Sequence, residues 1–172
     1  TCPRPNPADN PSCARDRLFA ADFPSGLTIG DLDGPDGDSE FAARWTSASA
    51  IASFLPAGGM PATLNADATD PSATSAAVFA GQLVSAKLSL AFSDDRSGRA
   101  MDALVYQEAC GGNNPFVGST IGNIVEMCDA VISGASSIAT PSACNTALDA
   151  FNNTFVDCQR RTDCYELEGV EP

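Results

Sequence analysis

Residues 118–158 read GSTIGNIVEMCDAVISGASSIATPSACNTALDAFNNTFVDC, and this stretch decides the fold. Its first half places apolar residues at helical spacing and then a glycine suited to a helix C-cap: Ile121, Ile124, Val125, Cys128, Val131 and Gly134. From Thr140-Pro141, a typical helix start, a second apolar stripe runs along the chain: Cys144, Leu148, Phe151, Phe155 and Cys158. Because the link between the halves is short, the pattern predicts two helices packed as an antiparallel hairpin.

The preceding residues predict a small β-structure and further helices. Residues 27–46 favour a β-hairpin around an acidic loop at 31–40. Ser47 is placed to cap a short helix that ends at Pro56, and Asp70-Pro71 is placed to begin a long helix that runs to about residue 92. The tail of that long segment, residues 88–92, alternates and is also compatible with a strand.

A short strand is expected at residues 101–110. The predicted fold class is therefore α+β: a small β-hairpin or sheet packed on about four helices, ending in a disulfide-linked antiparallel helical hairpin. Residues 1–172 are expected to form a single secreted, disulfide-stabilised domain, with a proline-rich N-terminal arm at 1–16 and a frayed acidic tail at 165–172. The polar, proline-rich start is typical of a mature form whose leader has been removed.

The chain contains seven cysteines, one lysine (Lys87) and no histidine. So many cysteines favour an oxidising compartment, and hence a secreted, extracellular protein. Without histidine the chain lacks the commonest general base, so Ser-His-Asp and Cys-His catalysis are excluded. Paired carboxylates such as Asp94-Asp95, or Glu126 with Asp129, have no spacing that marks a hydrolase. The protein is therefore expected not to be an enzyme.

The predicted helical hairpin brings Cys128 and Cys144 to the same level on two apolar stripes, so they form the first predicted disulfide. Cys110 is expected at the end of a strand and Cys158 at the end of the last helix, which makes Cys110–Cys158 the second predicted bond. A local bond between Cys158 and Cys164 is the competing prediction. Each bond would stabilise the protein by about 2–4 kcal/mol, because it lowers the conformational entropy of the unfolded chain.

The two N-terminal cysteines, Cys2 and Cys13, are predicted to bond either to each other or to the body of the protein. Because seven is odd, one thiol must be left over within this chain. By elimination it is Cys164, on the acidic tail, either free or bonded to another molecule. The alternative is a cysteine that simply stays reduced or buried. No two cysteines have the spacing of a CxxC zinc site.

An acidic loop is the strongest local candidate for a metal site. Its carboxylates are Asp31, Asp33, Asp36, Asp38 and Glu40. Hard oxygen ligands at this density are typical of calcium sites, so calcium is the one cofactor considered. The spacing departs from an EF-hand because Pro35 occupies a ligand position. The alternative is a solvated hairpin turn with no cofactor.

Asn152-Asn153-Thr154 is an acceptor sequence for N-glycosylation, with Asn152 as the modified residue, although it falls on a predicted helix. The net charge of −13, from 9 basic and 22 acidic residues, argues against nucleic acid as a partner. No apolar run reaches the roughly 18–20 residues of a membrane-spanning helix, so no membrane span is expected.

Residues 46–94, TSASAIASFLPAGGMPATLNADATDPSATSAAVFAGQLVSAKLSLAFSD, carry a FLPxGGxP turn followed by a VFxGQL helix, and a closing FxxC appears near residue 158. This pattern resembles an uncharacterised module of large secreted and cell-surface proteins of environmental bacteria. The resemblance covers about two thirds of the chain. It implies an exported surface module and no catalytic activity. The acidic stretch at 31–40 and most of the cysteines depart from the pattern.

Together these features predict a non-catalytic extracellular structural or assembly module of a surface layer, filament or appendage. Its expected partners are further copies of itself or other extracellular surface proteins. The alternative prediction is a soluble calcium-dependent binding module, directed at carbohydrate, that uses the 31–40 loop.

Overall fold

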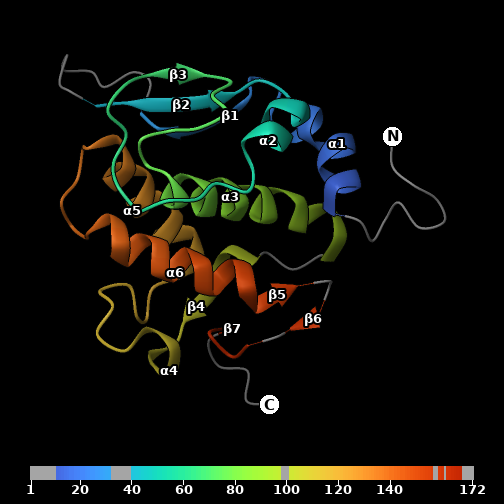
Figure 1. Cartoon of the computed structure of the whole chain (residues 1–172). Coiled ribbons are helices and arrows are strands. Elements are labelled where there is room, and N and C mark those ends of the chain that lie inside the picture. The colour runs from blue at the N-terminus through green and yellow to red at the C-terminus, as the bar shows by residue number, and fades with distance from the viewer. Residues whose placement is uncertain (1–10, 32–39, 98–100, 157–158, 161, 168–172) are drawn as a thin grey trace.

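The computed structural model describes residues 11–31, 40–97, 101–156, 159–160 and 162–167 (Figure 1). The helices in these residues are α1 (Pro11–Asp22), α2 (Ala48–Phe54), α3 (Val78–Ser97), α4 (Glu108–Gly111), α5 (Ile121–Ser133) and α6 (Pro141–Thr154), with a 3-10 turn η1 (Met101–Ala103). The strands are β1 (Leu27–Gly30), β2 (Ala42–Trp45), β3 (Ala68–Thr69), β4 (Leu104–Tyr106), β5 (Phe155–Val156), β6 (Gln159–Arg160) and β7 (Tyr165–Leu167). The predicted α+β class is confirmed.

The elements form layers around α3. Figure 1 shows the β1-β2-β3 sheet on one side of α3 and α6 on the other, with α4 and the β4–β7 pair beyond α6. The helix α5 packs against α3, α6 and β1, and α1 packs against α2 and α3. This arrangement gives the chain one continuous hydrophobic core.

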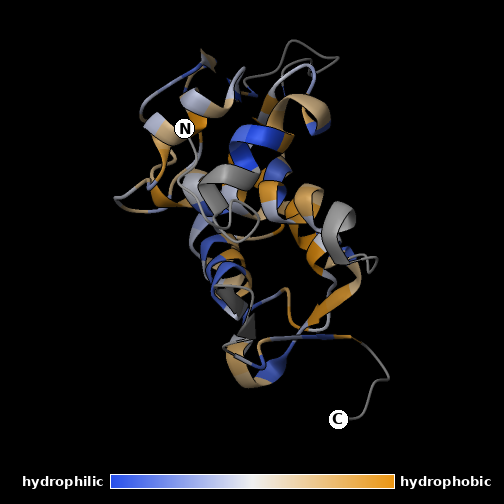
Figure 2. Cartoon of the chain, turned by 90° about the vertical axis from the view of Figure 1, so that its right-hand side faces the viewer, coloured by the Kyte–Doolittle hydropathy of each residue, from blue (hydrophilic) through white to orange (hydrophobic). Residues whose placement is uncertain are grey.

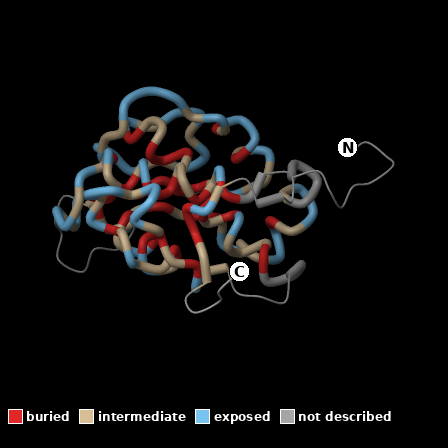
Figure 3. The backbone as a smooth tube through the Cα atoms, turned by 90° about the horizontal axis from the view of Figure 1, so that it is seen from below, coloured by how far each residue is buried: buried red, intermediate tan, exposed pale blue. Residues whose placement is uncertain are grey.

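The core gathers in the middle of the molecule, with exposed residues around it (Figure 3). Its largest fully buried side chains come from most parts of the described chain: Trp45, Tyr106, Tyr165, Phe79, Phe116, Leu27, Ile29, Ile51, Leu83, Ile121, Ile124 and Ile132. Burial of apolar side chains contributes about 1.5–3 kcal/mol each before the entropy of ordering is subtracted, so this core is the main source of stability.

The hairpin predicted at residues 27–46 is confirmed. β1 and β2 pair antiparallel, with Leu27 opposite Trp45 and Gly30 opposite Ala42. The short strand β3 joins β2 in parallel. Because strand side chains alternate between faces, Leu27 and Ile29 both enter the core. The two ends of the 31–40 segment are thereby brought together at the end of the sheet.

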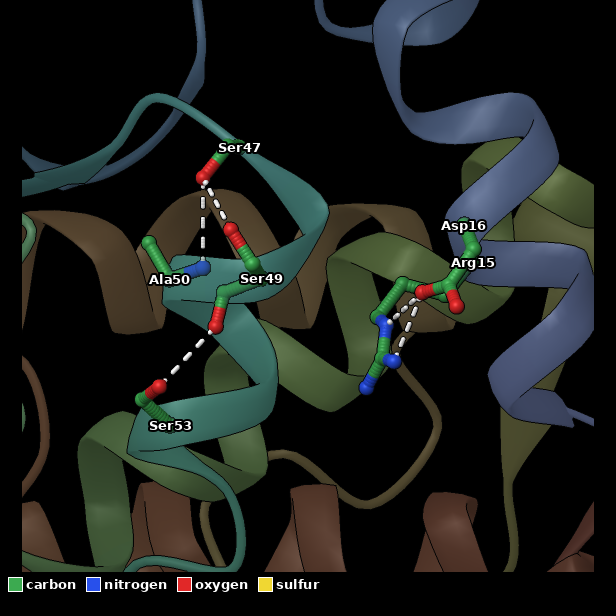
Figure 4. A network of polar contacts seen from close by, with 6 residues as sticks. All are labelled: Arg15, Asp16, Ser47, Ser49, Ala50 and Ser53. Atoms are coloured by element: carbon green, nitrogen blue, oxygen red, sulfur yellow. Dashed lines mark hydrogen bonds and ion pairs between the residues drawn. The ribbon is translucent and has the colours of Figure 1, made fainter. Parts of the chain in front are cut away.

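The helix predicted after Ser47 is also confirmed as α2. The Ser47 hydroxyl accepts a hydrogen bond from the backbone N–H of Ala50 at 3.2 Å and contacts the hydroxyl of Ser49 at 3.0 Å (Figure 4). This is an N-cap, which satisfies one of the free N–H groups of the first turn. The helix ends at Phe54, just before Pro56.

The predicted start of the long helix at Asp70-Pro71 is wrong, because α3 begins at Val78. The Asp70 carboxylate does accept hydrogen bonds, but from a residue distant in sequence. The backbone N–H and the hydroxyl of Thr46 both donate to it, each at 2.7 Å. These two hydrogen bonds lower the pKa of Asp70. The carboxylate thus holds the loop to the end of β2. Residues 88–92, where a strand was the alternative, are helical.

The two C-terminal helices match the sequence prediction closely. Thr120 caps α5, whose predicted apolar stripe is buried, and Gly134 takes the left-handed conformation of a C-cap. The hydroxyl of Thr140 accepts from the backbone N–H of Ala143 at the start of α6. The last helix is shorter than predicted, because it ends at Thr154 and residues 155–156 pair with 159–160.

The first helix, α1, was not predicted, since residues 1–16 were expected to be an irregular proline-rich arm. Pro11 opens α1, where its missing N–H costs no hydrogen bond, and the other prolines of the arm precede it. Arg15 and Asp16 form an ion pair at 2.7 Å on α1, which packs beside α2 (Figure 4).

The segment at 101–110 is only partly a strand, because β4 ends at Tyr106 and residues 108–111 form α4. The tail at 165–172 was expected to be frayed, but residues 165–167 form β7, which pairs antiparallel with β4. Tyr165 is fully buried. The sequence pattern missed this strand because three residues are too few to show a period.

Among the described residues, no helix combines the length and apolar character needed to cross a bilayer. Figure 2 shows hydrophilic stretches interspersed with hydrophobic ones along the ribbon.

Gly30, at the end of β1, has a positive φ of 77°, and a Cβ there would collide with the backbone carbonyl oxygen of Phe41. Gly118 has a similar φ of 82°, but a Cβ there would meet nothing within 4 Å. Substitution Gly118→Ala should therefore cost about 1–2 kcal/mol, the left-handed backbone penalty alone. Gly30→Ala should cost at least about 2 kcal/mol more, since backbone must also move. Urea unfolding of the two variants checks this, and equal losses would contradict it.

Candidate functional site

A disulfide joins α4 to the residue before β7. Cys110 bonds Cys164, with an S–S distance of 2.09 Å and a Cα–Cα distance of 5.3 Å. The predicted free thiol at Cys164 is therefore wrong. So are both predicted bonds that use one of these two residues, Cys110–Cys158 and Cys158–Cys164.

The burial of Tyr165 explains this pairing. Its ring stacks on Tyr106 at 5.0 Å between centroids and meets Phe151 edge-on at 5.4 Å. Its hydroxyl donates to the backbone carbonyl oxygen of Ala147 at 3.0 Å, and burial raises its pKa. Because Tyr165 is fixed in the core, the adjacent Cys164 lies next to α4, where it bonds Cys110. The signal that could have found this was an aromatic residue directly after a cysteine, in a tail otherwise rich in acids.

Cys128 and Cys144, the first predicted disulfide, are both thiols in this structure. The predicted neighbourhood is correct, because burial and then the nearby Cys144 on α6 raise the pKa of the Cys128 thiol on α5. Both residues have 0% of their surface exposed. The final helical pair is therefore not disulfide-linked in this structure, although its two sulfurs lie together.

Three cysteine predictions fall outside the described parts. Cys2 and Cys158 lie in stretches that the structure does not describe, and Cys13 lies in α1 with its side chain undescribed. The predicted bonds of Cys2 and Cys13 stay predictions. With Cys110 and Cys164 paired, the number of remaining cysteines is still odd, so one of them has no cysteine partner within the chain.

The acidic loop is described only at its two ends. Asp31 is exposed and Glu40 is half-buried, while Asp33, Asp36 and Asp38 lie outside the described residues. No group of metal-ligating side chains occurs among the described residues. The calcium site therefore stays a prediction.

A sixth carboxylate lies at the base of that loop, and from the sequence it was considered only as a possible partner of Glu126. Asp129 on α5 accepts from the backbone N–H of Gly30 at 2.9 Å and pairs with Lys87 on α3 at 2.5 Å. The Lys87 ammonium also donates to the backbone carbonyl oxygen of Thr28 at 2.8 Å. One ion pair thus ties α3, α5 and β1 together. Because Lys87 neutralises Asp129, this carboxylate is committed to the fold.

Burial has the largest effect on Asp129 and raises the pKa of its carboxyl. Lys87 and the Gly30 N–H act in the opposite direction, and Asp31 adds to the rise. A raised carboxyl pKa means that the folded state holds the proton more tightly than the unfolded chain. The stability that Asp129 contributes is therefore present at low pH and falls as pH rises through its folded pKa.

Asn152, the predicted glycosylation acceptor, faces α3. Its Nδ2 donates to the backbone carbonyl oxygen of Gln82 at 3.0 Å and to the side-chain oxygen of Gln82 at 2.5 Å. Gln82 in turn donates to Asp149 at 2.8 Å. A glycan on Nδ2 would remove these contacts from the α3–α6 interface. The folded structure therefore argues against modification of Asn152.

The substitution Lys87→Met tests the ion pair. It leaves Asp129 partly buried without its cation, so at neutral pH the free energy of unfolding should fall by about 2 kcal/mol. Without Lys87 the pKa of Asp129 rises further. The deficit should therefore shrink as pH falls from neutral to about 4, because the folded variant takes up the carboxyl proton at a higher pH than the unsubstituted protein. Urea unfolding at both pH values measures it.

The matched control is Lys87→Met with Asp129→Asn, which keeps an oxygen for the Gly30 N–H and removes the charge. It should recover part of the loss at neutral pH and show a flatter pH dependence. A Lys87→Met deficit that is the same at both pH values would contradict the role given to this pair.

The Cys110–Cys164 bond spans 54 residues of sequence, so its loss should lower the free energy of unfolding by about 4 kcal/mol through the entropy of the unfolded chain. The double substitution Cys110→Ala with Cys164→Ala removes it, and guanidinium unfolding measures the change. Mild reduction of the unsubstituted protein, followed by thiol titration, is the control for side-chain truncation. Unchanged stability in both samples would contradict the expectation.

In comparisons with known proteins, no family model matches the chain, and no curated protein or solved structure matches it. The resemblance of residues 46–94 to an uncharacterised bacterial surface module therefore stays a prediction.

Proposed function

We propose that this chain is a non-catalytic structural module of an extracellular surface layer, filament or appendage. The observation that carries the proposal is the Cys110–Cys164 disulfide, which joins two segments 54 residues apart. Disulfides form and persist in oxidising environments, and cytosolic proteins rarely keep them. Here the bond secures the C-terminal strand to the body of the domain, which is a stabilising task.

The polar contacts of the interior also hold the helices and strands of the fold together. Lys87 is the chain's one lysine, and its ammonium is used in a cross-link between α3, α5 and β1. Gln82 and Asn152 use their amides to join α3 to α6. The Lys87 ammonium and the two amide nitrogens each donate to a protein partner. Such a body suits a module that must stay folded outside the cell.

The charge sets the conditions under which copies can associate. With −13 per chain, two copies repel each other over a distance that salt determines. At an ionic strength of about 0.1 M the screening length is about 10 Å, and it shortens as salt rises. Assembly should therefore be favoured at high ionic strength. The same charge repels nucleic acid and anionic membrane surfaces.

The odd cysteine, if it joins copies covalently, is not Cys164. Cys110 and Cys164 bond each other, and Cys128 and Cys144 are fully buried and out of reach of another molecule. The sulfur left over is therefore Cys2, Cys13 or Cys158. This moves the proposed intermolecular bond away from the acidic tail.

Assembly is tested on chain exported to an oxidising compartment and purified without reductant. We expect a disulfide-linked dimer on a denaturing gel without reductant, and larger particles by light scattering as salt is raised from low to high concentration. Single substitutions Cys2→Ser, Cys13→Ser and Cys158→Ser identify the bridging sulfur, and removal of that sulfur should abolish the dimer.

Cys110→Ser with Cys164→Ser is the matched control, because it removes sulfurs that are not assigned to assembly. Monomers on the gel, in high salt and by electron microscopy would together refute the assembly role. Turnover of a substrate by the purified protein would refute the non-catalytic assignment.

A further inference from the structure

The contact between α5 and α6 holds two thiols against each other inside the core. Cys128 and Cys144 are each fully buried on two helices that pack together, and both belong to one core cluster. After burial, the nearby Cys144 is the next cause that raises the pKa of the Cys128 thiol. No disulfide joins them in this structure. Two thiols in contact are the reduced form of a disulfide, so the pair is a place where the chain can gain a covalent bond.

The helices fix the position of both sulfurs. Thr120 and Gly134 cap the two ends of α5, and Thr140 caps the start of α6. The side chains around the pair belong to the same core cluster. Because interiors are close-packed and caps fix where each helix begins and ends, the two thiols stay in register rather than sampling other partners.

We infer that Cys128 and Cys144 form an oxidation site, which closes to a second intramolecular disulfide before the α5–α6 contact is sealed. The inference rests on the proposed function in one respect, since an oxidising compartment supplies the oxidant. The two thiols lose two protons and two electrons as the bond between their sulfurs forms. A disulfide oxidant, such as oxidised glutathione, takes up those electrons and protons and is cleaved to two thiols.

The order of events follows from access. Thiol–disulfide exchange needs a thiolate that can reach the oxidant. In the folded protein the Cys128 sulfur is covered, and its burial, the neighbouring Cys144 and Asp129 all raise the pKa of its thiol. Exchange on the closed protein must therefore wait until α5 and α6 separate. During folding, both sulfurs are still open to the oxidant.

The same reasoning separates this site from the disulfide that is already formed. Cys110 is an exposed residue, so a reductant can approach the Cys110–Cys164 bond in the folded state. Both sulfurs of a bond between Cys128 and Cys144 would be buried, so a reductant could not reach either of them in the folded state. The two disulfides should thus differ in how easily each is reduced, with the α5–α6 bond the more resistant.

The full chain is refolded from the reduced, denatured state in a buffer of reduced and oxidised glutathione. It is then denatured, alkylated without reduction, and cleaved after aspartate and glutamate. Cleavage after Asp129 separates Cys128 from Cys144, so a bond between them appears as a linked pair of peptides in the mass spectrum. We expect the linked pair. Alkylated Cys128 and Cys144 in the oxidised, folded protein would overturn the inference.

The inaccessibility of the two thiols in the folded protein is tested separately. The protein is refolded with reductant present and is then transferred to oxidised glutathione. Cys128 and Cys144 should react at least about 100-fold more slowly in buffer than in denaturant, because the reaction needs local opening. Equal rates would overturn the order of events. The variant Cys128→Ala with Cys144→Ala is the control for peptide assignment, and it should lose the linked pair and keep the Cys110–Cys164 peptides.

This outcome is independent of assembly. A chain that oxidises at Cys128 and Cys144 but remains monomeric would support the oxidation site and count against the proposed surface role. A chain that assembles with both thiols alkylated would do the reverse.

Discussion

Burial of α3 on several sides is the constraint on which the rest of the structure depends. α3 contacts α5, α6, α1 and β1, and most side chains between residues 79 and 88 are buried. A buried polar group without a partner costs about 1–3 kcal/mol, so a helix in this position must have its polar side chains matched by its neighbours. Lys87 finds Asp129 and the Thr28 carbonyl oxygen, and Gln82 finds Asp149 and Asn152.

These matched groups decide how the layers meet. Apolar contact has no direction, and it would tolerate several placements of β1 and α6 along α3. The ion pair between Lys87 and Asp129 fixes α5 and the end of β1 against one turn of α3. The amides of Gln82 and Asn152 fix α6 against an earlier turn. Polar contacts thus supply the register, while the apolar core supplies most of the free energy.

The local parts of the fold could be predicted because their causes lie within a few residues. The caps at Ser47 and Thr140, the C-cap at Gly134 and the apolar stripes of α5 and α6 all act over one or two turns of chain. The hairpin of β1 and β2 joins neighbouring segments. The neighbourhood of Cys128 and Cys144 followed from the same helical hairpin.

The parts that failed depend on distant partners. Asp70 has the sequence context of a helix cap, yet its carboxylate serves Thr46 across a loop. An aromatic residue after a cysteine indicates burial of Tyr165, but it does not show that the ring will contact Tyr106 and Phe151. The partner of Cys164 therefore could not be read from the sequence.

Composition and local pattern by themselves determined an acidic, cysteine-rich α+β domain without histidine, and the positions of its best helices. Only the tertiary structure decided which cysteines bond, that Lys87 joins Asp129, and that Asn152 faces α3. The physical reason is range. Periodicity and caps are properties of adjacent residues, whereas a disulfide or an ion pair depends on where packing brings two distant segments together.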